Sequence, residues 1–322
     1  MTVVRTEKLT KEYKHDFIGF EYGRMKINFV PKKTCALINL DLEVQKGEIF
    51  GLLGPNGAGK TTAIKILMSL IYPTKGRAWI LDQPLDNIEV KTKLGYLPEN
   101  PYFYDYLKGW EFLDFYGQLY GLNRVDRMKR SKELLKLVGI EYAANLPLKG
   151  YSKGMLQRIG LAQALLNNPT IVILDEPLGG LDPFGRKELR DLILSLNKDK
   201  GVTIFFSSHI LSDVETVCDR VAILYKGRLK ASGRLGELLS AKTNEWELTI
   251  EGLEESKIDD IKPNIKKVIS HEKELFIVLD KQELLPIILE RINRENAKLV
   301  SLVPRKETLE EYFIRMLGGN QE

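Results

Sequence analysis

Residues 54–61, which read GPNGAGKT, combine glycines, a lysine and a threonine in an order that suits a polyphosphate. The spacing matches the pattern G-x-x-x-x-G-K-[ST], whose glycines let backbone N–H groups approach phosphates closely. Lys60 would neutralise the β- and γ-phosphates, and Thr61 would offer its hydroxyl group to Mg²⁺. The pattern therefore predicts a nucleotide-binding site that also holds Mg²⁺. The predicted nucleotide-binding residues of this loop are Gly54, Pro55, Asn56, Gly57, Ala58, Gly59, Lys60, Thr61 and Thr62.

Two carboxylates and a histidine follow buried strands further along the chain. In ILDEP, residues 173–177, side chains alternate along a strand, so Asp175 and Glu176 cannot share one purpose. Asp175 would reach Mg²⁺ through water, and Glu176 would orient or deprotonate the attacking water. A merely polar strand end is the structural alternative, which the phosphate loop makes the weaker interpretation. His209 lies at the carboxyl end of its strand, where ligands bind in such sheets, and should contact the γ-phosphate.

The segment YSKGMLQR, residues 151–158, contains no histidine, carboxylate or cysteine. Ser152 is a good N-cap, and a helix that begins with free N–H groups attracts an anion. The apolar residues that follow have the spacing of one helix face, so the segment predicts a helix. The N-terminus of this helix should bind an anion, although the segment has no side chain with obvious catalytic chemistry. The apolar residues on that face are Met155, Leu156, Ile159, Ala162 and Leu166.

The elements that position these residues alternate between strands and helices. We expect strands at 3–8, 36–40, 49–53, 171–175, 203–208, 220–225 and 228–233, and helices at 61–71, 110–122, 127–140, 152–166, 183–197 and 211–219. Such alternation indicates an α/β fold with a parallel, wound sheet. The aromatic stretch 17–29 has no clear period and is predicted to be a surface insertion.

The composition changes near Leu239, which predicts a second, small α+β domain over residues 239–322 after a first domain over residues 1–238. Strands are expected at 246–250, 266–270, 274–279 and 299–303. Helices are expected at 284–297 and 308–317, each opened by a capping box. The boxes are Asp280 with Glu283, and Thr308 with Glu311.

The composition of the 322 residues is that of an ordinary globular protein, with 43% hydrophobic and 29% charged residues and a net charge of +4. Lysine and arginine are spread along the chain, so nucleic-acid binding is not expected. Cys35 and Cys218 form no disulfide framework and should be packing residues in a reducing cytosol. The charged N-terminus does not suit a signal peptide, and no apolar run of about 18 residues exists, so a membrane role would require a partner.

Taken in chain order, these motifs resemble those of the nucleotide-binding subunit of an ABC transporter. The resemblance covers residue 1 to about residue 238. It rests on GPNGAGKTT, the Q-loop position in GYLPEN, the signature YSKGMLQR, ILDEP, the D-loop GGLD and the switch histidine His209. It implies a P-loop NTPase domain of ABC type with a mixed sheet core and a helical subdomain at about 100–165.

The resemblance also implies a head-to-tail homodimer in which each ATP lies between one chain's phosphate loop and the other chain's signature. Asp182 is the D-loop residue. Glu99 stands where the family has glutamine, and could ligate Mg²⁺ or hold a proton. Tyr13 is the expected stacking partner of adenine, with Phe20 and Tyr22 as alternatives. The signature residues that would receive the partner's ATP are Ser152, Lys153, Gly154 and Met155. The commonest signature in the family is LSGGQ, and Tyr151, Lys153 and Met155 replace three of its five positions.

The YSKGM-type signature, the glutamate in GYLPE and the C-terminal domain are similar to those of ATPases from two-component exporters. This implies a peripheral protein at the cytoplasmic face of the membrane, whose residues 100–165 would dock a separate integral membrane permease. The alternative for the aromatic stretch 102–116 within that segment is that it belongs only to the core. The alternative is a soluble ABC-family ATPase that acts on ribosomes or DNA. Such proteins usually carry two ATP modules or long coiled-coil or zinc insertions, which this sequence lacks. A nucleotide sensor without turnover would be favoured by loss of Glu176 or His209, and both are present.

Overall fold

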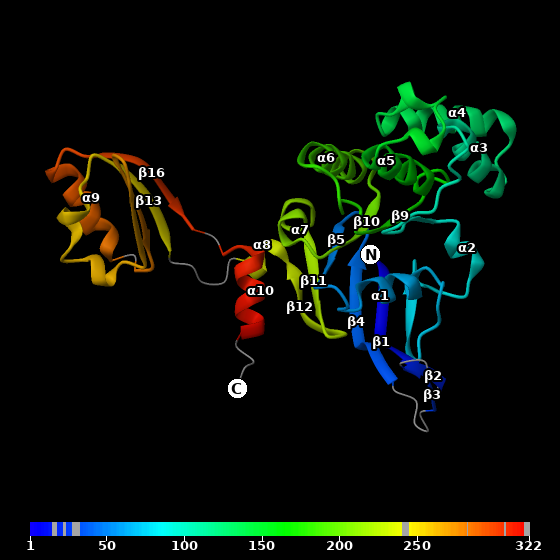
Figure 1. Cartoon of the computed structure of the whole chain (residues 1–322), viewed down its shortest axis with the longest axis horizontal. Coiled ribbons are helices and arrows are strands. Elements are labelled where there is room, and N and C mark those ends of the chain that lie inside the picture. Colours follow the sequence, from blue (N-terminus) through cyan, green and yellow to red (C-terminus); the bar gives the residue numbers. More distant parts are fainter. Residues whose placement is uncertain are drawn as a thin grey trace. The chain divides into compact units, whose positions relative to one another are not determined.

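The computed structural model describes residues 1–14, 18–21, 24–27, 33–239, 245–281, 283–305 and 307–318. The chain divides into two compact units, Met1–Leu235 and Gly236–Glu322. Figure 1 colours both along the sequence, with the first unit running from blue to yellow-green. Among the described residues, no helix is both long and apolar enough to span a membrane.

The first unit is built on a six-stranded sheet in which all neighbours but one are parallel (Figure 1). Its strands, in spatial order, are β12 (Arg228–Arg234), β11 (Arg220–Tyr225), β5 (Ile49–Leu53), β10 (Thr203–Ser208), β9 (Ile171–Asp175) and β8 (Leu94–Leu97). Strands β5, β9 and β10 are buried along their whole length, as their continuous apolar runs predict. Because they are parallel neighbours, their carboxyl ends meet at one edge of the sheet.

A second, antiparallel sheet makes the fold mixed rather than purely parallel. It has the order β4 (Lys33–Gln45), β1 (Thr2–Lys14), β6 (Lys75–Ile80) and β7 (Gln83–Pro84). The predicted strand 3–8 was too short because β1 continues past Lys8, which has a positive φ of 46° beside a break in register. The stretch 17–29, predicted to be a surface insertion without clear periodicity, contains an antiparallel hairpin, β2 (Ile18–Glu21) and β3 (Arg24–Ile27).

Helices flank the first sheet and carry the residues of interest. They are α1 (Lys60–Leu67), α2 (Ile88–Lys91), α3 (Gly109–Leu119), α4 (Arg124–Leu137), α5 (Lys153–Ala164), α6 (Pro183–Lys200) and α7 (Leu211–Val217). Helix α1 ends four residues earlier than predicted and packs Ile64 and Ile66 into a core shared by both sheets. Helices α3, α4 and α5 contact one another and form the green helical region of Figure 1. Cys218 is buried but Cys35 is exposed, so only Cys218 is a packing residue.

The second unit is a four-stranded antiparallel sheet with a helix over its apolar face, which confirms the predicted α+β class. Its elements are β14 (Lys267–His271), β15 (Glu274–Leu279), β13 (Trp246–Glu251), β16 (Lys298–Pro304), α9 (Leu284–Arg294), α10 (Leu309–Gly318) and the short α8 (Leu235–Leu239) that spans the boundary. The capping box at α10 is confirmed, since Thr308 and Glu311 bond each other's backbone N–H at 3.0 and 3.2 Å. The box at α9 was wrong, because the N-cap residue is Glu283 rather than Asp280, and its side chain makes no capping hydrogen bond.

Candidate functional site

The phosphate loop connects the buried strand β5 to helix α1 and lies against neighbouring backbone. A Cβ atom at Gly54 or Gly59 would overlap the carbonyl oxygens of Leu224 and Ala36, and both glycines have positive φ angles, 156° and 109°. Only glycine suits these two positions. Gly59, which precedes α1, supplies no side-chain cap. The first N–H groups of α1 thus have the arrangement that binds anions at helix N-termini.

A cavity of about 390 Å³ opens over this loop. It gathers most of the predicted ATP-binding residues together with two predicted carboxylates from other elements. Its lining residues are Asn56, Gly57, Ala58, Gly59, Lys60, Thr61, Thr62, Glu99, Glu176 and Ala36. Ala36 comes from β4, whose position beside the loop follows from the second sheet, and no signal in the sequence pointed to it.

The side chain of Lys60 is buried, at 6% exposure, and it has three partners, one of which is the carbonyl oxygen of Pro55 at 3.4 Å. Its ammonium group donates to the carbonyl oxygen of Gly54 at 2.7 Å and lies 3.2 Å from Oε1 of Glu176. A buried cation is costly unless it is paired, and Glu176 supplies the pairing charge. The predicted phosphate-binding lysine and the predicted base are therefore direct neighbours.

Glu176, which directly follows β9, contacts residues at the end of the neighbouring strand β10. Its Oε2 lies 2.8 Å from Nδ1 of His209, and its backbone N–H donates to the carbonyl oxygen of Ser207 at 3.2 Å. The backbone at Glu176 is left-handed, with φ of 50°, a conformation that costs a residue other than glycine about 1–3 kcal/mol. Strain of this kind is held in place by surrounding contacts and is typical of functional sites.

Asp175 lies just before it, at 1% exposure, and is held by hydroxyl groups. Its Oδ1 accepts a hydrogen bond from Oγ of Ser207 at 2.6 Å, and the Thr61 side chain also bonds to it. Burial raises the pKa of Asp175, and the nearby charges of Glu176 and Glu99 raise it further, while the two hydroxyl groups lower it. Ser207 therefore bonds both the carboxylate of Asp175 and the backbone N–H of Glu176, a role that sequence reasoning missed although the residue lies in the predicted strand TIFFSS.

The carboxylates create a negative field that a cation would neutralise. Burial, followed by the charges of Asp175 and Glu99, raises the pKa of Tyr96 to about 12. No group of three or more metal-ligating side chains forms among the described residues. The donors at hand, the Thr61 hydroxyl and the Asp175 carboxylate, fit Mg²⁺, which is commonly held by one or two protein groups plus substrate phosphates.

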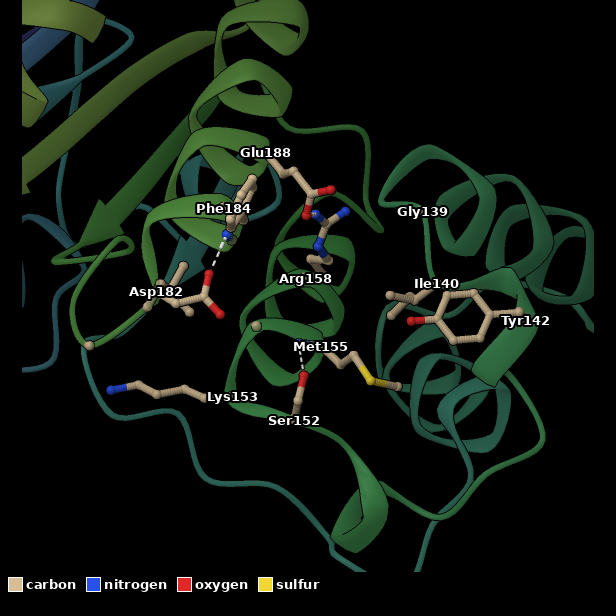
Figure 2. Close-up of a pocket in the computed structure, with 14 residues that line it drawn as sticks. Gly139, Ile140, Tyr142, Ser152, Lys153, Met155, Arg158, Asp182, Phe184 and Glu188 are labelled. Carbon is tan, nitrogen blue, oxygen red and sulfur yellow. Dashed lines mark hydrogen bonds and ion pairs between the residues drawn. The ribbon is translucent and has the colours of Figure 1, made fainter.

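The signature residues line a second cavity, of about 630 Å³, together with the D-loop (Figure 2). Ser152 caps α5 as predicted, since its Oγ accepts from the backbone N–H of Met155 at 3.3 Å. Asp182 caps α6, accepting from the N–H of Gly185 at 2.7 Å, so two helices begin at this cavity. The predicted residues gathered here are Ser152, Lys153, Gly154, Met155 and Asp182. Among the residues that the structure describes, none lines both cavities, so the signature residues and the phosphate loop lie at separate cavities.

The predicted adenine partner, Tyr13, lies near the end of β1 and does not line the phosphate-loop cavity. Its side chain is 39% exposed, and the ammonium group of Lys11 sits 5.3 Å from its ring centre. Tyr22 lies outside the described residues, and Phe20 belongs to β2. Stacking on adenine therefore stays a prediction for these three aromatic residues.

The wound sheet, the glycine-rich loop before α1 and the carboxylates at the neighbouring strand ends define a P-loop nucleotide-binding domain. The family model described as ABC transporter matches residues 37–179. The ABC transporter ATP-binding protein sll0415 of Synechocystis sp. is 43% identical over 317 residues, which are 98% of this chain and 84% of that protein. The chain belongs to the family of ABC transporter ATP-binding proteins, ATPases that couple ATP hydrolysis to transport.

Two further comparisons agree with this assignment. The bacitracin transport ATP-binding protein BcrA of Enterococcus faecalis is 33% identical over 325 residues, covering 98% of this chain and 97% of that one. The solved dimeric structure of MJ0796, a bacterial ABC transporter cassette, is 27% identical, with a TM-score of 0.61 over 72% of this chain and 98% of the cassette. The fold is thus an ABC-type nucleotide-binding domain with an added antiparallel-sheet domain.

Proposed function

We propose that this chain is the ATP-hydrolysing subunit of an exporter, which dimerises head to tail and drives transport through a separate membrane permease at the cytoplasmic face. The export direction is supported by similarity to BcrA, which is named for bacitracin transport. Dimerisation is supported by the dimeric cassette MJ0796. It is also supported by the separation of the signature cavity from the phosphate-loop cavity within one chain.

The contact of Glu176 with both Lys60 and His209, at 3.2 and 2.8 Å, is the observation that carries the catalytic assignment. In this proposal Lys60 and the loop N–H groups hold the β- and γ-phosphates. Glu176 accepts a proton from the water whose oxygen attacks the γ-phosphorus, while the bond to the ADP oxygen breaks. His209 fixes the carboxylate of Glu176 and contacts the γ-phosphate.

Thr61 and Asp175 would hold Mg²⁺, the second through water, and Glu99 stays a candidate for the same ion. The ion neutralises the negative charge of the phosphates when bound. The hydroxyl groups of Ser207 and Thr61 fix the orientation of the Asp175 carboxylate. The raised pKa of Asp175 means that the site favours a positive charge beside this group.

At the second cavity, Ser152, Lys153, Gly154 and Met155 would receive the γ-phosphate of the partner's ATP, with Asp182 beside them. Of the two carboxylates there, Asp182 caps α6 and Glu188 pairs with Arg158 at 2.6 Å (Figure 2). Both are engaged within the chain, and the N-terminus of α5 carries no acidic residue. An anion brought by a partner chain suits this arrangement.

The permease would dock on the helical region, where Trp110 and Met128 are 42% and 63% exposed beside a cavity of about 400 Å³. Large exposed apolar groups of this kind are typical of interaction sites. The sequence of the unit Gly236–Glu322 contains no phosphate-binding motif, and this unit would act as an accessory domain that regulates or stabilises the dimer.

The test of the catalytic assignment is Glu176→Gln, which keeps the size of the side chain but removes the base. Steady-state hydrolysis should fall by about 10²-fold or more while ATP binding persists. Lys60→Ala is the matched contrast, because it should weaken nucleotide binding itself. Turnover near that of the wild type in Glu176→Gln would reject Glu176 as the base.

A further inference from the structure

The first unit contains a buried carboxylate that the proposed mechanism does not use. Asp213, in α7, is 3% exposed, and its Oδ2 has no hydrogen-bond partner among the described residues. The closest cation is the guanidinium of Arg186 in α6, with Nη1 3.8 Å from Oδ2. The Nε of Arg186 is also buried without a partner in the described part of the chain. Charge balances charge here, but the hydrogen bonds that normally accompany a buried ion pair are not formed.

The two residues connect the beginnings of two functional helices. Arg186 lies in the first turn of α6, and its backbone N–H donates at 2.9 Å to the carbonyl oxygen of Asp182, the D-loop residue. Asp213 lies in the first turn of α7, which begins directly after His209 and Ile210. One partner of the pair therefore sits a turn from the signature cavity, and the other sits a turn from the switch histidine.

The charged groups that act on Asp213 lie in α6 and at the ends of the strands that carry Glu176 and His209. Burial raises its pKa, and the nearby Glu176 also raises it, while Arg186, Arg190 and His209 lower it. Asp213 is thus close enough to the catalytic carboxylate and histidine to interact with both electrostatically. Arg190, one turn beyond Arg186 on α6, faces the same carboxylate but forms no ion pair with it at 4 Å or less among the described residues.

We propose that Arg186 and Asp213 are positioning residues that couple occupation of the signature cavity to the placement of His209 against Glu176. The inference rests on the proposed function. A partner's ATP that contacts the D-loop would also shift the first turn of α6, because Asp182 is the N-cap of that helix and Arg186 lies in its first turn. A shift of about 1 Å would bring the pair to the 2.7–2.9 Å of a charge-assisted hydrogen bond. Asp213 then holds α7, and with it His209, in one position.

The experiment compares Asp213→Asn, Arg186→Gln and the double variant in the full-length chain. Each single variant should lower kcat by about 10-fold or more, because small misplacements near a reaction centre have effects up to about 10²-fold. The KM for ATP and ATP binding to a single chain should change little, since neither residue lines the phosphate-loop cavity. The double variant should be no slower than either single variant, as expected for two residues that act as one unit.

Two further variants separate positioning from stability. Arg186→Lys keeps the charge and should recover part of the lost kcat, whereas Arg190→Gln is the matched control and should have the smaller effect. A purely structural ion pair would lower the melting temperature and leave the kcat of the folded fraction unchanged. Wild-type kcat in Arg186→Gln, or losses that add in the double variant, would overturn the proposal. If Asp213→Asn fails to fold, Arg186→Gln decides alone, since Arg186 is 31% exposed. The proposed function fails separately, through normal turnover in Glu176→Gln.

Discussion

Gly154 is the second residue of α5, and substitution there should change stability and activity in opposite directions. A Cβ atom at this position would lie 3.9 Å from Leu181 and 4.0 Å from Ser152, ordinary contact distances. The glycine is not among those with positive φ, so a side chain brings no backbone strain. The first turn of α5 contains no acidic residue. Gly154→Asp therefore adds a carboxylate where the helix dipole favours one, and removes a flexible glycine.

The expected magnitudes follow from these contacts. A carboxylate in the first turn of a helix stabilises it by about 0.3–1 kcal/mol, and loss of the glycine adds a few tenths. For a unit the size of Met1–Leu235, a gain of about 1 kcal/mol raises the melting temperature by roughly 2–4 °C. Against a partner's γ-phosphate, two charges about 4 Å apart repel by about 4 kcal/mol at an effective dielectric constant of 20. A third of that energy already weakens the composite site about tenfold.

The assay measures melting, ATP binding, ATP-driven dimerisation and hydrolysis for Gly154→Asp and its neutral isostere Gly154→Asn. Gly150→Ala is the control, because a Cβ there meets nothing within 4 Å and Gly150 does not line the cavity. Gly154→Asp should bind ATP as one chain but neither dimerise nor turn over. Mixed with Lys60→Ala chains, it should regain one intact composite site and some hydrolysis. Normal hydrolysis by Gly154→Asp alone would reduce the segment to a well-capped core helix and refute the reasoning.

Three other predictions concern single groups. Tyr13→Ala should weaken ATP binding by about 1–3 kcal/mol in a titration with labelled nucleotide, while Tyr13→Phe should not; unchanged affinity would reassign the stacking role. Burial raises the pKa of Asp175, so the folded chain binds a proton at this group more tightly than the unfolded chain does. The free energy of unfolding of the wild type therefore falls as the pH rises through that raised pKa. Without nucleotide, Asp175→Asn should therefore melt above the wild type at pH 7, by a margin that shrinks in acid; a pH-independent margin would contradict the electrostatic origin. A chain that ends at Leu239 should still bind ATP. If this fragment folds but does not bind ATP, the predicted domain boundary is wrong.

The sequence predicted the first sheet's buried strands and their functional ends because each signal was local and strong. The loop before α1 needed its glycines, and Asp175 and His209 followed apolar runs. Proximity of Glu176 and His209 could be inferred, since both follow strands of one parallel sheet. The direct contact of Lys60 with Glu176 could not, because strand order depends on long-range pairing that no local pattern records.

In the second sheet, β1 and β4 were predicted only in part and β6 and β7 were missed, for physical reasons. Strand β1 changes register after Thr6, so its alternation of buried and exposed residues breaks and the predicted strand stopped near Lys8. Strand β6 begins with three exposed residues and contains Gly76, so it lacks an apolar run. Its place is fixed by pairing with β1, which the sequence does not show.

In the proposed mechanism, the pairing of Lys60 with Glu176 would connect substrate binding to the activation of water. Lys60 has three N–H donors. The carbonyl oxygens of Gly54 and Pro55 accept hydrogen bonds from its ammonium group at 2.7 and 3.4 Å, and Oε1 of Glu176 lies 3.2 Å from it. A triphosphate in the loop brings a multiply charged partner to the same ammonium group and competes with the carboxylate. As Lys60 turns to the phosphates, Glu176 keeps His209 as its partner on Oε2, and its Oε1 becomes available to a water molecule. In this arrangement the carboxylate of Glu176 is free to accept a proton only when a triphosphate occupies the loop. Glu176 would then act as a base only when the bond between the γ-phosphate and ADP is present to be broken.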